Sequence, residues 1–259
     1  MILKVTPKVI ILVGPGTNCD EETLFSLRYL GAEPYVYLLR EIKKNPKKIH
    51  DFGAIVIPGG FSYGDYVAAG RMFAREMELF LGKELERFLK KGGFILGICN
   101  GFQILVSSLL LPGLKEWFLP PRVSLISNDS MQYEDRWVFL RVEKKDVFWF
   151  KGLPSVIELP VAHAEGKFFA PKTTIQALKR NKQIALRYVM PDGTYAKYPY
   201  NPNGSLEGIA AITDKTGQIL GMMPHPERFF FSEQNPLRDS IYPWGRKIFA
   251  NLIKEIKRI

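Results

Sequence analysis

The chain has 259 residues, of which 46% are hydrophobic and 24% are charged, a composition typical of a globular protein and not of a disordered or low-complexity chain. Two cysteines are too few for a disulfide framework, and no apolar run reaches the roughly 18 residues that span a bilayer, so we expect no membrane partner and a reducing, cytoplasmic location. The net charge of +10 keeps a nucleic-acid-binding role open.

The first 110 residues alternate between predicted strands and helices. Apolar runs predict strands at 9–13, 34–39, 54–57 and 94–98. Helices are expected from Asn18, which forms a capping-box pattern with Glu21, to Gly31, then over 67–90, and again directly after Cys99; residues 43–48 form a predicted basic loop. This alternation predicts an open, mostly parallel, doubly wound α/β sheet flanked by helices.

The pattern changes after Pro112. Short strand-like runs at 123–126, 137–142, 156–159, 184–189 and 208–213 are separated by turn residues, and a hairpin turn at 214–217 leads to a further strand at 218–222. A final helix is expected over 244–257. With no internal repeat and no long linker, the sequence predicts a single domain, 1–259, in which antiparallel strands extend a parallel core in the C-terminal half.

The strongest chemical signal is Cys99, which lies between a buried strand and a helix in the sequence GICNG at 97–101. This G-x-nucleophile-x-G pattern is typical of a nucleophile elbow, a strained turn whose flanking glycines make room for the reactive side chain. A helix N-terminus also favours the thiolate. Cys19 has no such setting and is interpreted as structural.

A thiolate nucleophile needs a base, and His225 is the best candidate among the three histidines. It follows a predicted strand, and Glu227 is two residues further on, where an extended chain with Pro226 brings both side chains to the same side. His50 follows a lysine run and is set aside. With no CxxC or HExxH pattern, no metal site is expected.

Acyl chemistry also needs donors for an oxyanion. The backbone N–H of Asn100, directly after the nucleophile, is one candidate. The second is Gly60, in the glycine-rich end of the strand at 54–57, where the lack of a side chain lets a peptide N–H approach a substrate.

The motifs GICNGFQ at 97–103 and PHPER at 224–228 resemble those of the class I (triad) glutamine amidotransferases. Four further blocks, at 15–20, 58–65, 162–168 and 198–205, are similar to the glutaminase subunits of phosphoribosylformylglycinamidine synthase within that class. The blocks extend from residue 15 to residue 228, so the resemblance covers nearly the whole chain.

The resemblance implies a flavodoxin-like fold and a mechanism. Cys99 would attack the side-chain amide of L-glutamine to form a glutamyl thioester. His225 would protonate the departing ammonia and then activate water, Glu227 would orient His225, and Gln103 would contact the bound glutamine. His163, in the block AHAEGKF at 162–168, is open to three interpretations: an interface residue, a glutamine-site residue or a structural hydrogen bonder.

The resemblance also implies partners. Ammonia would pass to a synthetase subunit that uses ATP and magnesium to convert formylglycinamide ribonucleotide to its amidine, and a small third subunit would complete the complex. This chain has no P-loop, so no cofactor of its own is expected. The alternatives are a glutaminase subunit of another synthetase and a flavodoxin-like cysteine hydrolase. Nucleic-acid binding is disfavoured because the basic residues are scattered, apart from 43–48 and 254–258.

Overall fold

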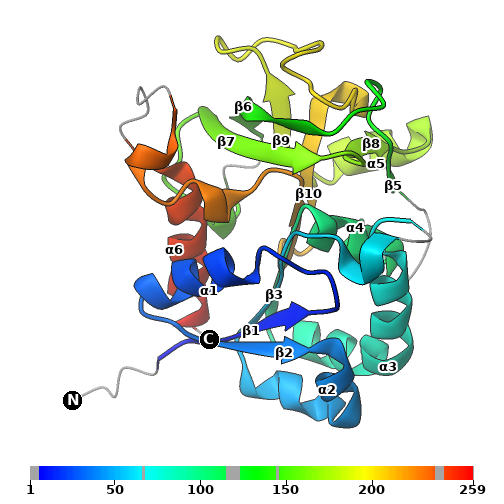
Figure 1. Ribbon diagram of the computed structural model, residues 1–259, viewed down its shortest axis with the longest axis vertical. Coiled ribbons are helices and arrows are strands. Elements are labelled where there is room, and N and C mark those ends of the chain that lie inside the picture. Colours follow the sequence, from blue (N-terminus) through cyan, green and yellow to red (C-terminus); the bar gives the residue numbers. More distant parts are fainter. Residues whose placement is uncertain (1–5, 66–67, 115–122, 144–145, 237–241, 259) are drawn as a thin grey trace.

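The computed structural model describes residues 6–65, 68–114, 123–143, 146–236 and 242–258. Within these residues one sheet holds nine strands in the spatial order β2-β1-β3-β4-β11-β10-β9-β6-β7 (Figure 1). Its strands are β1 (Lys8–Val13), β2 (Glu33–Leu38), β3 (Ala54–Ile57), β4 (Phe94–Ile98), β6 (Glu134–Val142), β7 (Val156–His163), β9 (Ile184–Val189), β10 (Ile209–Thr213) and β11 (Ile219–Met222). Two short strands, β5 (Ser124–Ile126) and β8 (Lys167–Phe169), form a separate antiparallel pair.

The sheet is parallel in one half and antiparallel in the other. Strands β2, β1, β3, β4 and β11 run parallel, in the order expected of a flavodoxin-like core. From β10 to β7, every neighbouring pair is antiparallel. The predicted fold class, a mostly parallel core with antiparallel strands added in the C-terminal half, is confirmed, and the two parts are joined edge to edge in one sheet.

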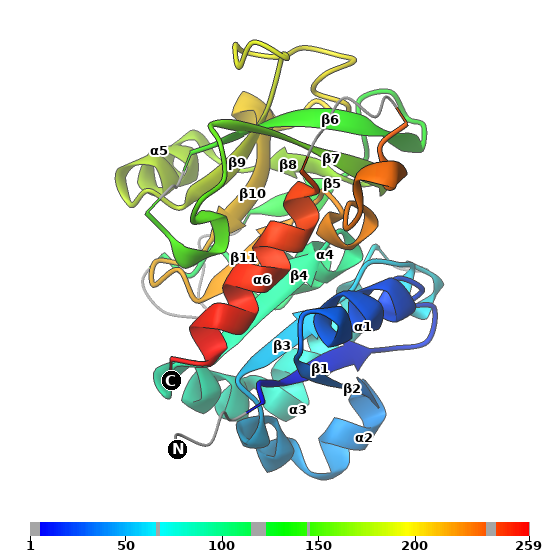
Figure 2. The ribbon, with the colours of Figure 1, turned by 90° about the vertical axis from the view of Figure 1, so that its left-hand side faces the viewer.

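Helices cover both faces of the parallel half. The helices are α1 (Asp20–Tyr29), α2 (Leu39–Lys44), α3 (Arg71–Lys90), α4 (Asn100–Ser107), α5 (Lys172–Arg180) and α6 (Trp244–Ile256), of which α5 lies in the antiparallel half (Figures 1 and 2). In Figures 1 and 2, α1 and α6 lie on one face of the sheet and α3 and α4 on the other. Strands β3 and β4 are buried along their entire length between these layers, which explains their continuous apolar sequences.

The predicted start of the first helix at Asn18 is wrong. Helix α1 begins at Asp20 with Cys19 at the N-cap, and no side chain caps it. The reason is a contact with a distant segment. The N–H groups of Asn18 and Cys19 both donate to the carbonyl of Gly59, and Thr17 pairs with Gly60. These bonds hold residues 17–19 against the end of β3 in a non-helical conformation, so the helix begins only at Asp20.

The predicted basic loop at 43–48 is also wrong. Lys43 and Lys44 end helix α2, and a 3₁₀ helix, Pro46–Asp51, follows. Helix α2 forms here because Leu39 and Ile42 are buried against the core. Lys43 pairs with Glu76 of α3 at 3.1 Å, so part of the basic charge is neutralised within the chain.

Most remaining elements agree with prediction. Helix α3 begins at Arg71, later than the predicted start at residue 67: residue 67 lies outside the described residues, but 68–70 are not helical and Gly70, the N-cap, has a left-handed φ of 71°. Strand β7 extends four residues beyond the predicted 156–159, to His163, whereas α5 and β8 were not predicted. Among the described residues, we find no helix that combines the length and the apolar character needed to cross a membrane.

Candidate active site

Cys99 occupies a sharp turn at the carboxyl end of β4. Its φ of 51° and ψ of −106° lie outside the conformations that side-chain-bearing residues favour, and helix α4 begins at the next residue. The predicted strained turn is therefore present. Non-glycine residues hold such backbone angles only where surrounding structure enforces them, and they cluster at functional sites.

The glycines on either side of Cys99 are required by packing. A Cβ on Gly101 would lie 1.9 Å from the carbonyl oxygen of Ile57, and a Cβ on Gly97 would lie 2.5 Å from Leu105 Cδ1. Any larger residue would therefore push α4 away from β3 and β4. The two glycines bring helix and strands close enough to force the turn at Cys99.

His225 is brought to Cys99 because β11 lies parallel to β4, so the chain after both strands emerges at the same edge of the sheet. The N–H of His225 donates to the carbonyl of Pro160 at 2.8 Å, which fixes the backbone there. A Cβ on Gly59 would lie 2.8 Å from His225 Cε1 and 3.4 Å from Cys99 Cβ, so both side chains converge on this glycine.

Glu227 lies beside His225, as predicted, but not through an extended chain. Residues Pro226–Arg228 form a 3₁₀ turn, and this turn carries the carboxylate back to the imidazole. His225 Nδ1 lies 2.5 Å from Glu227 Oε1, and the two residues are 1% and 2% exposed. The opposite ring nitrogen, Nε2, is buried and has no hydrogen-bond partner in the described part of the chain.

The electrostatics favour a charged imidazole. Burial lowers the pKa of His225, but the negative charges of Glu227 and Cys99 outweigh it and hold the pKa well above its ordinary value. A protonated imidazole facing a sulfur is the arrangement in which a thiolate–imidazolium pair performs nucleophilic catalysis.

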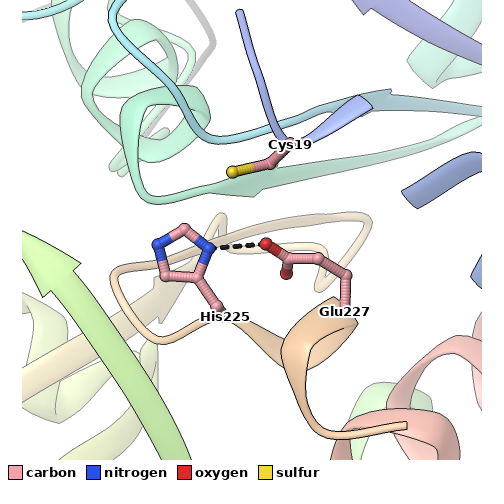
Figure 3. A group of neighbouring side chains, drawn as sticks. All are labelled: Cys19, His225 and Glu227. Carbon is pink, nitrogen blue, oxygen red and sulfur yellow. Dashed lines mark hydrogen bonds and ion pairs between the residues drawn. The ribbon is translucent and has the colours of Figure 1, made fainter. Parts of the chain in front are cut away.

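Cys19 lies at the same site, which the interpretation as a structural residue missed. Figure 3 shows its side chain pointing toward the hydrogen-bonded pair of His225 and Glu227, with the sulfur close to the imidazole. Donor atoms of these three side chains all lie within 4.8 Å of one another, and the guanidinium of Arg228 donates to Cys19 Sγ at 3.2 Å. The sequence PGTNCD at 15–20, one of the blocks singled out above, was the available signal.

The same three side chains, Cys19, His225 and Glu227, form the group in the described residues that could hold a metal ion. Three of their donor atoms are already engaged, since His225 Nδ1 contacts Glu227 Oε1 and Cys19 Sγ accepts from Arg228, whereas His225 Nε2 and Glu227 Oε2 have no partner in the described residues. The absence of a metal site stays a prediction.

The two candidate oxyanion donors flank the nucleophile. Gly60 has a φ of 140°, and a Cβ there would lie 2.7 Å from the backbone nitrogen of Asn18. Asn100 is the first residue of α4, and its side-chain oxygen accepts a hydrogen bond from the N–H of Ser62 at 3.2 Å, which ties the Gly60 loop to the nucleophile turn. Their role as donors stays a prediction.

The cavity beside Cys99 has a volume of about 260 Å³. Its lining includes Cys19, Gly60, Asp65, Cys99, Gln103, Tyr133, His163, Glu165, His225 and Arg228. Gln103 lines it as expected, with its amide held in place: Nε2 donates to the carbonyl of Glu165 at 2.5 Å, and Oε1 accepts from Asn100 at 2.9 Å. His50, set aside earlier, lies elsewhere and contacts Glu84 at 2.8 Å.

His163 is a buried, hydrogen-bonded residue at the wall of this cavity. Its Nδ1 lies 3.2 Å from Asn128 Oδ1 and its Nε2 lies 3.4 Å from Asn203 Nδ2. Burial, assisted by the positive charge of His225, lowers the pKa of His163 to about 3. A neutral ring with both nitrogens engaged supports the interpretation as a structural hydrogen bonder, whereas the roles as an interface residue or a glutamine-site residue stay predictions.

Comparison with known proteins agrees with this geometry. A family model described as CobB/CobQ-like glutamine amidotransferase domain matches residues 6–254. The chain is 40% identical to phosphoribosylformylglycinamidine synthase subunit PurQ of Methanococcus maripaludis over 91% of its length and 87% of the relative's. It is 39% identical to the same subunit of Archaeoglobus fulgidus over 97% and 98% of the two chains. Among solved structures, a chain of PurLQS from Thermotoga maritima is 31% identical, with a TM-score of 0.73, over 96% of this chain and 99% of that one.

Proposed function

The chain belongs to the family of CobB/CobQ-like glutamine amidotransferase domains, and we propose that it acts as the glutaminase subunit of phosphoribosylformylglycinamidine synthase. It hydrolyses L-glutamine and supplies the ammonia for de novo purine biosynthesis. The observation that carries this proposal is the placement of a strained cysteine, Cys99, in one cavity with His225, whose other ring nitrogen is bound by the buried carboxylate of Glu227.

In the proposed mechanism Cys99 is the nucleophile. Its sulfur attacks the side-chain amide carbon of glutamine, and the C–N bond breaks as His225 gives its proton to the departing ammonia. Water, giving a proton back to His225, then attacks the glutamyl thioester and releases glutamate and the free thiol. Glu227 keeps His225 in the orientation and charge state that both steps need.

Both steps pass through a tetrahedral carbon bearing an oxyanion. The backbone N–H groups of Gly60 and Asn100 are the proposed donors, since they belong to the two loops that meet at Cys99 and are joined through the side chain of Asn100. Gln103, whose amide is held by two hydrogen bonds at the cavity wall, is placed to contact the substrate.

The ammonia is consumed by a separate synthetase subunit. That subunit uses ATP and magnesium to convert formylglycinamide ribonucleotide to formylglycinamidine ribonucleotide, and a small third subunit completes the assembly. The proposal is supported by relatives named as a subunit of this synthase and by the similarity to a chain of PurLQS. No cofactor is assigned to this chain, and its reaction takes place in the cytoplasm.

The proposal is tested by comparing two nitrogen sources in the reconstituted complex. The Cys99→Ala variant, assembled with the synthetase, should release no glutamate and form no amidine from glutamine, yet it should form amidine from ammonium chloride at the wild-type rate. Full glutamine-dependent activity in this variant would falsify the assignment. Turnover of esters or peptides, with no glutamine hydrolysis in the wild-type complex, would favour the cysteine hydrolase instead.

A further inference from the structure

The two cysteines of the chain line the same cavity, and the proposed mechanism uses only one of them. Cys99 is the nucleophile, whereas the mechanism assigns no role to Cys19. The side chains of Cys99 and Cys19 are 6% and 1% exposed, and the cavity that they share has a volume of about 260 Å³. A second thiol beside a nucleophilic cysteine has a chemical consequence, because two neighbouring thiols can be oxidised to a disulfide.

The order of strands in the sheet brings the two cysteines together. Strand β3 lies between β1 and β4 and runs parallel to both, so the segments that follow these strands emerge at the same edge of the sheet. Cys19, in the segment after β1, is fixed to the segment after β3, since its N–H donates to the carbonyl of Gly59 at 3.2 Å. Cys99 directly follows β4. Gly59 is therefore the residue that separates the two cysteines.

The separating residue has no side chain, and this leaves the two cysteines facing the same small space. A Cβ on Gly59 would lie 3.2 Å from Cys19 Sγ and 3.4 Å from Cys99 Cβ. The two side chains thus approach each other across a gap about one methyl group wide. A side chain at position 59 would fill this gap and keep the sulfurs apart.

Cys19 Sγ is oriented by polar contacts. The guanidinium of Arg228 donates to this sulfur at 3.2 Å, and the sulfur lies 3.4 Å from Asn18 Oδ1. Arg228 is itself held by Glu22 of α1 at 3.7 Å. These contacts fix the thiol at the wall of the cavity, where it lies close to the imidazole that activates the nucleophile.

The surroundings of Cys99 make it the thiol that an oxidant attacks first. Burial lowers the pKa of His225, but the charge of Glu227 and the sulfurs of Cys99 and Cys19 hold it well above its ordinary value. A positively charged imidazole beside a cysteine favours the thiolate, which is the form that peroxides oxidise. The feature that makes Cys99 a nucleophile therefore also makes it sensitive to oxidation.

We propose that Cys19 is a resolving cysteine, which forms a disulfide with Cys99 after hydrogen peroxide has oxidised the nucleophile. In the first step the Cys99 thiolate attacks one oxygen of the peroxide, the O–O bond breaks, hydroxide leaves, and Cys99 becomes a sulfenic acid. In the second step the Cys19 sulfur attacks the Cys99 sulfur, an S–S bond replaces the S–O bond, and the thiol proton leaves with the hydroxide as water. Two electrons pass from the thiols to the peroxide, and a thiol reductant returns them.

The disulfide switches off the nucleophile reversibly and protects it. A sulfenic acid that finds no second thiol is oxidised further to a sulfinic acid, which thiol reductants do not restore. With Cys19 present, oxidation stops at the disulfide, and reduction regenerates the Cys99 thiol. The inference rests on the proposed function for its activity measurement, whereas formation of the disulfide is measured on the chain itself.

The test follows the oxidation products of Cys99. The full-length chain is treated with hydrogen peroxide, catalase removes the excess, and the chain is assembled with untreated synthetase before or after reduction with dithiothreitol. In the wild type we expect a peptide that joins Cys19 to Cys99, loss of glutamine hydrolysis, and recovery of most of this activity on reduction. In Cys19→Ser, reduction should restore a fraction of the starting activity about fivefold smaller or less, with Cys99 found as the sulfinic acid. Ser26→Ala, which removes a buried hydroxyl from α1, is the control and should recover like the wild type.

Two results would overturn the inference. One is a peroxide-treated wild type in which no peptide joins Cys19 to Cys99, and the other is equal recovery of the wild type and Cys19→Ser on reduction. If Cys19→Ser does not fold, the joined peptide of the wild type decides the question by mass spectrometry alone. If the wild-type complex does not hydrolyse glutamine, the proposed function fails, and the same peptide still tests the inference.

Discussion

Glu227 Oε1 lies 2.5 Å from His225 Nδ1 in a site where both side chains are almost fully buried, and its second oxygen has no hydrogen-bond partner in the described residues. The carboxylate charge therefore acts mainly on a single imidazole. Because little water screens the pair, its effect on the protonation of His225 should be large.

Replacing this carboxylate by an amide should shift the pH dependence of the reaction. In Glu227→Gln the pKa of His225 should fall, because the charge that raises it is gone. The imidazolium then loses its proton at lower pH, so the alkaline limb of kcat/KM for glutamine should move to lower pH, with kcat reduced by about 10²–10⁴-fold. A pH–rate profile of the complex tests this, with Glu86→Gln as the control. An alkaline limb that stays in place would contradict the assigned role of Glu227.

The close approach of α4 to β3 should make Gly101 intolerant of substitution. In Gly101→Ala the new methyl group would lie 1.9 Å from the carbonyl of Ile57, so the helix and Cys99 must move. We expect a loss of about 1–3 kcal/mol in the free energy of unfolding and a severe loss of glutamine hydrolysis. Gly31→Ala is the matched control, since it carries backbone strain at φ 79° but has nothing within 4 Å. Gly31→Ala should lose about 1 kcal/mol in the free energy of unfolding and keep its glutamine hydrolysis.

His163 should make the protein less stable in acid. Its pKa in the folded protein is about 3, below the ordinary value of 6.5, so between these values the unfolded chain binds a proton that the folded chain does not. Stability from this residue is complete above pH 6.5 and is lost as the pH falls. From pH 6.5 to pH 5, the free energy of unfolding of the wild type should fall by about 1.5 kcal/mol more than that of His163→Gln. Urea denaturation of both proteins at both pH values measures the difference; parallel losses would argue against a neutral buried ring.

Asn100 should matter for catalysis beyond its contribution to stability. Its side chain accepts from Ser62 and donates to Gln103, so Asn100→Ala releases the loop that carries Gly60. We expect kcat/KM for glutamine to fall about tenfold to a hundredfold, with a loss of about 1–2 kcal/mol in unfolding free energy. Asn251→Ala removes comparable buried hydrogen bonds, to the carbonyls of Trp149 and Lys151, far from the cavity. If both variants lose equal activity, the oxyanion-loop role of Asn100 is wrong.

Some features of the fold could be predicted from the sequence because they are caused by residues that are neighbours along the chain. Strand β4, the turn at Cys99 and the start of α4 follow from an apolar run, two glycines and a helix-forming segment within fifteen residues. Helix α5 was missed although its signal was present: Thr174, Ile175 and Leu178 are the buried residues, at the spacing of one helical face.

Other features depend on partners that are distant in the sequence. Cys19 was interpreted as structural because it lacks the paired glycines and the strand-to-helix setting of Cys99, yet its sulfur contacts Arg228, which is 209 residues away. The start of α1 was misplaced because the carbonyl of Gly59, from another strand end, holds Asn18 and Cys19. His163 could be interpreted only once Asn128 and Asn203 were seen on its two nitrogens.

The sequence by itself determined the composition class and the order of strands and helices in the parallel half, and it predicted Cys99, His225 and Glu227 as nucleophile, base and orienting carboxylate. Each of these follows from periodicity or from a motif of a few consecutive residues, whose causes are local. The tertiary structure decided which groups share the cavity with Cys99: Cys19 beside His225, a neutral His163, and the two carboxylates of Asp65 and Glu165. The burial and the charge of a side chain at the site depend on all the residues that the sheet brings around it. Because these residues are distant in the sequence, no local pattern predicts them.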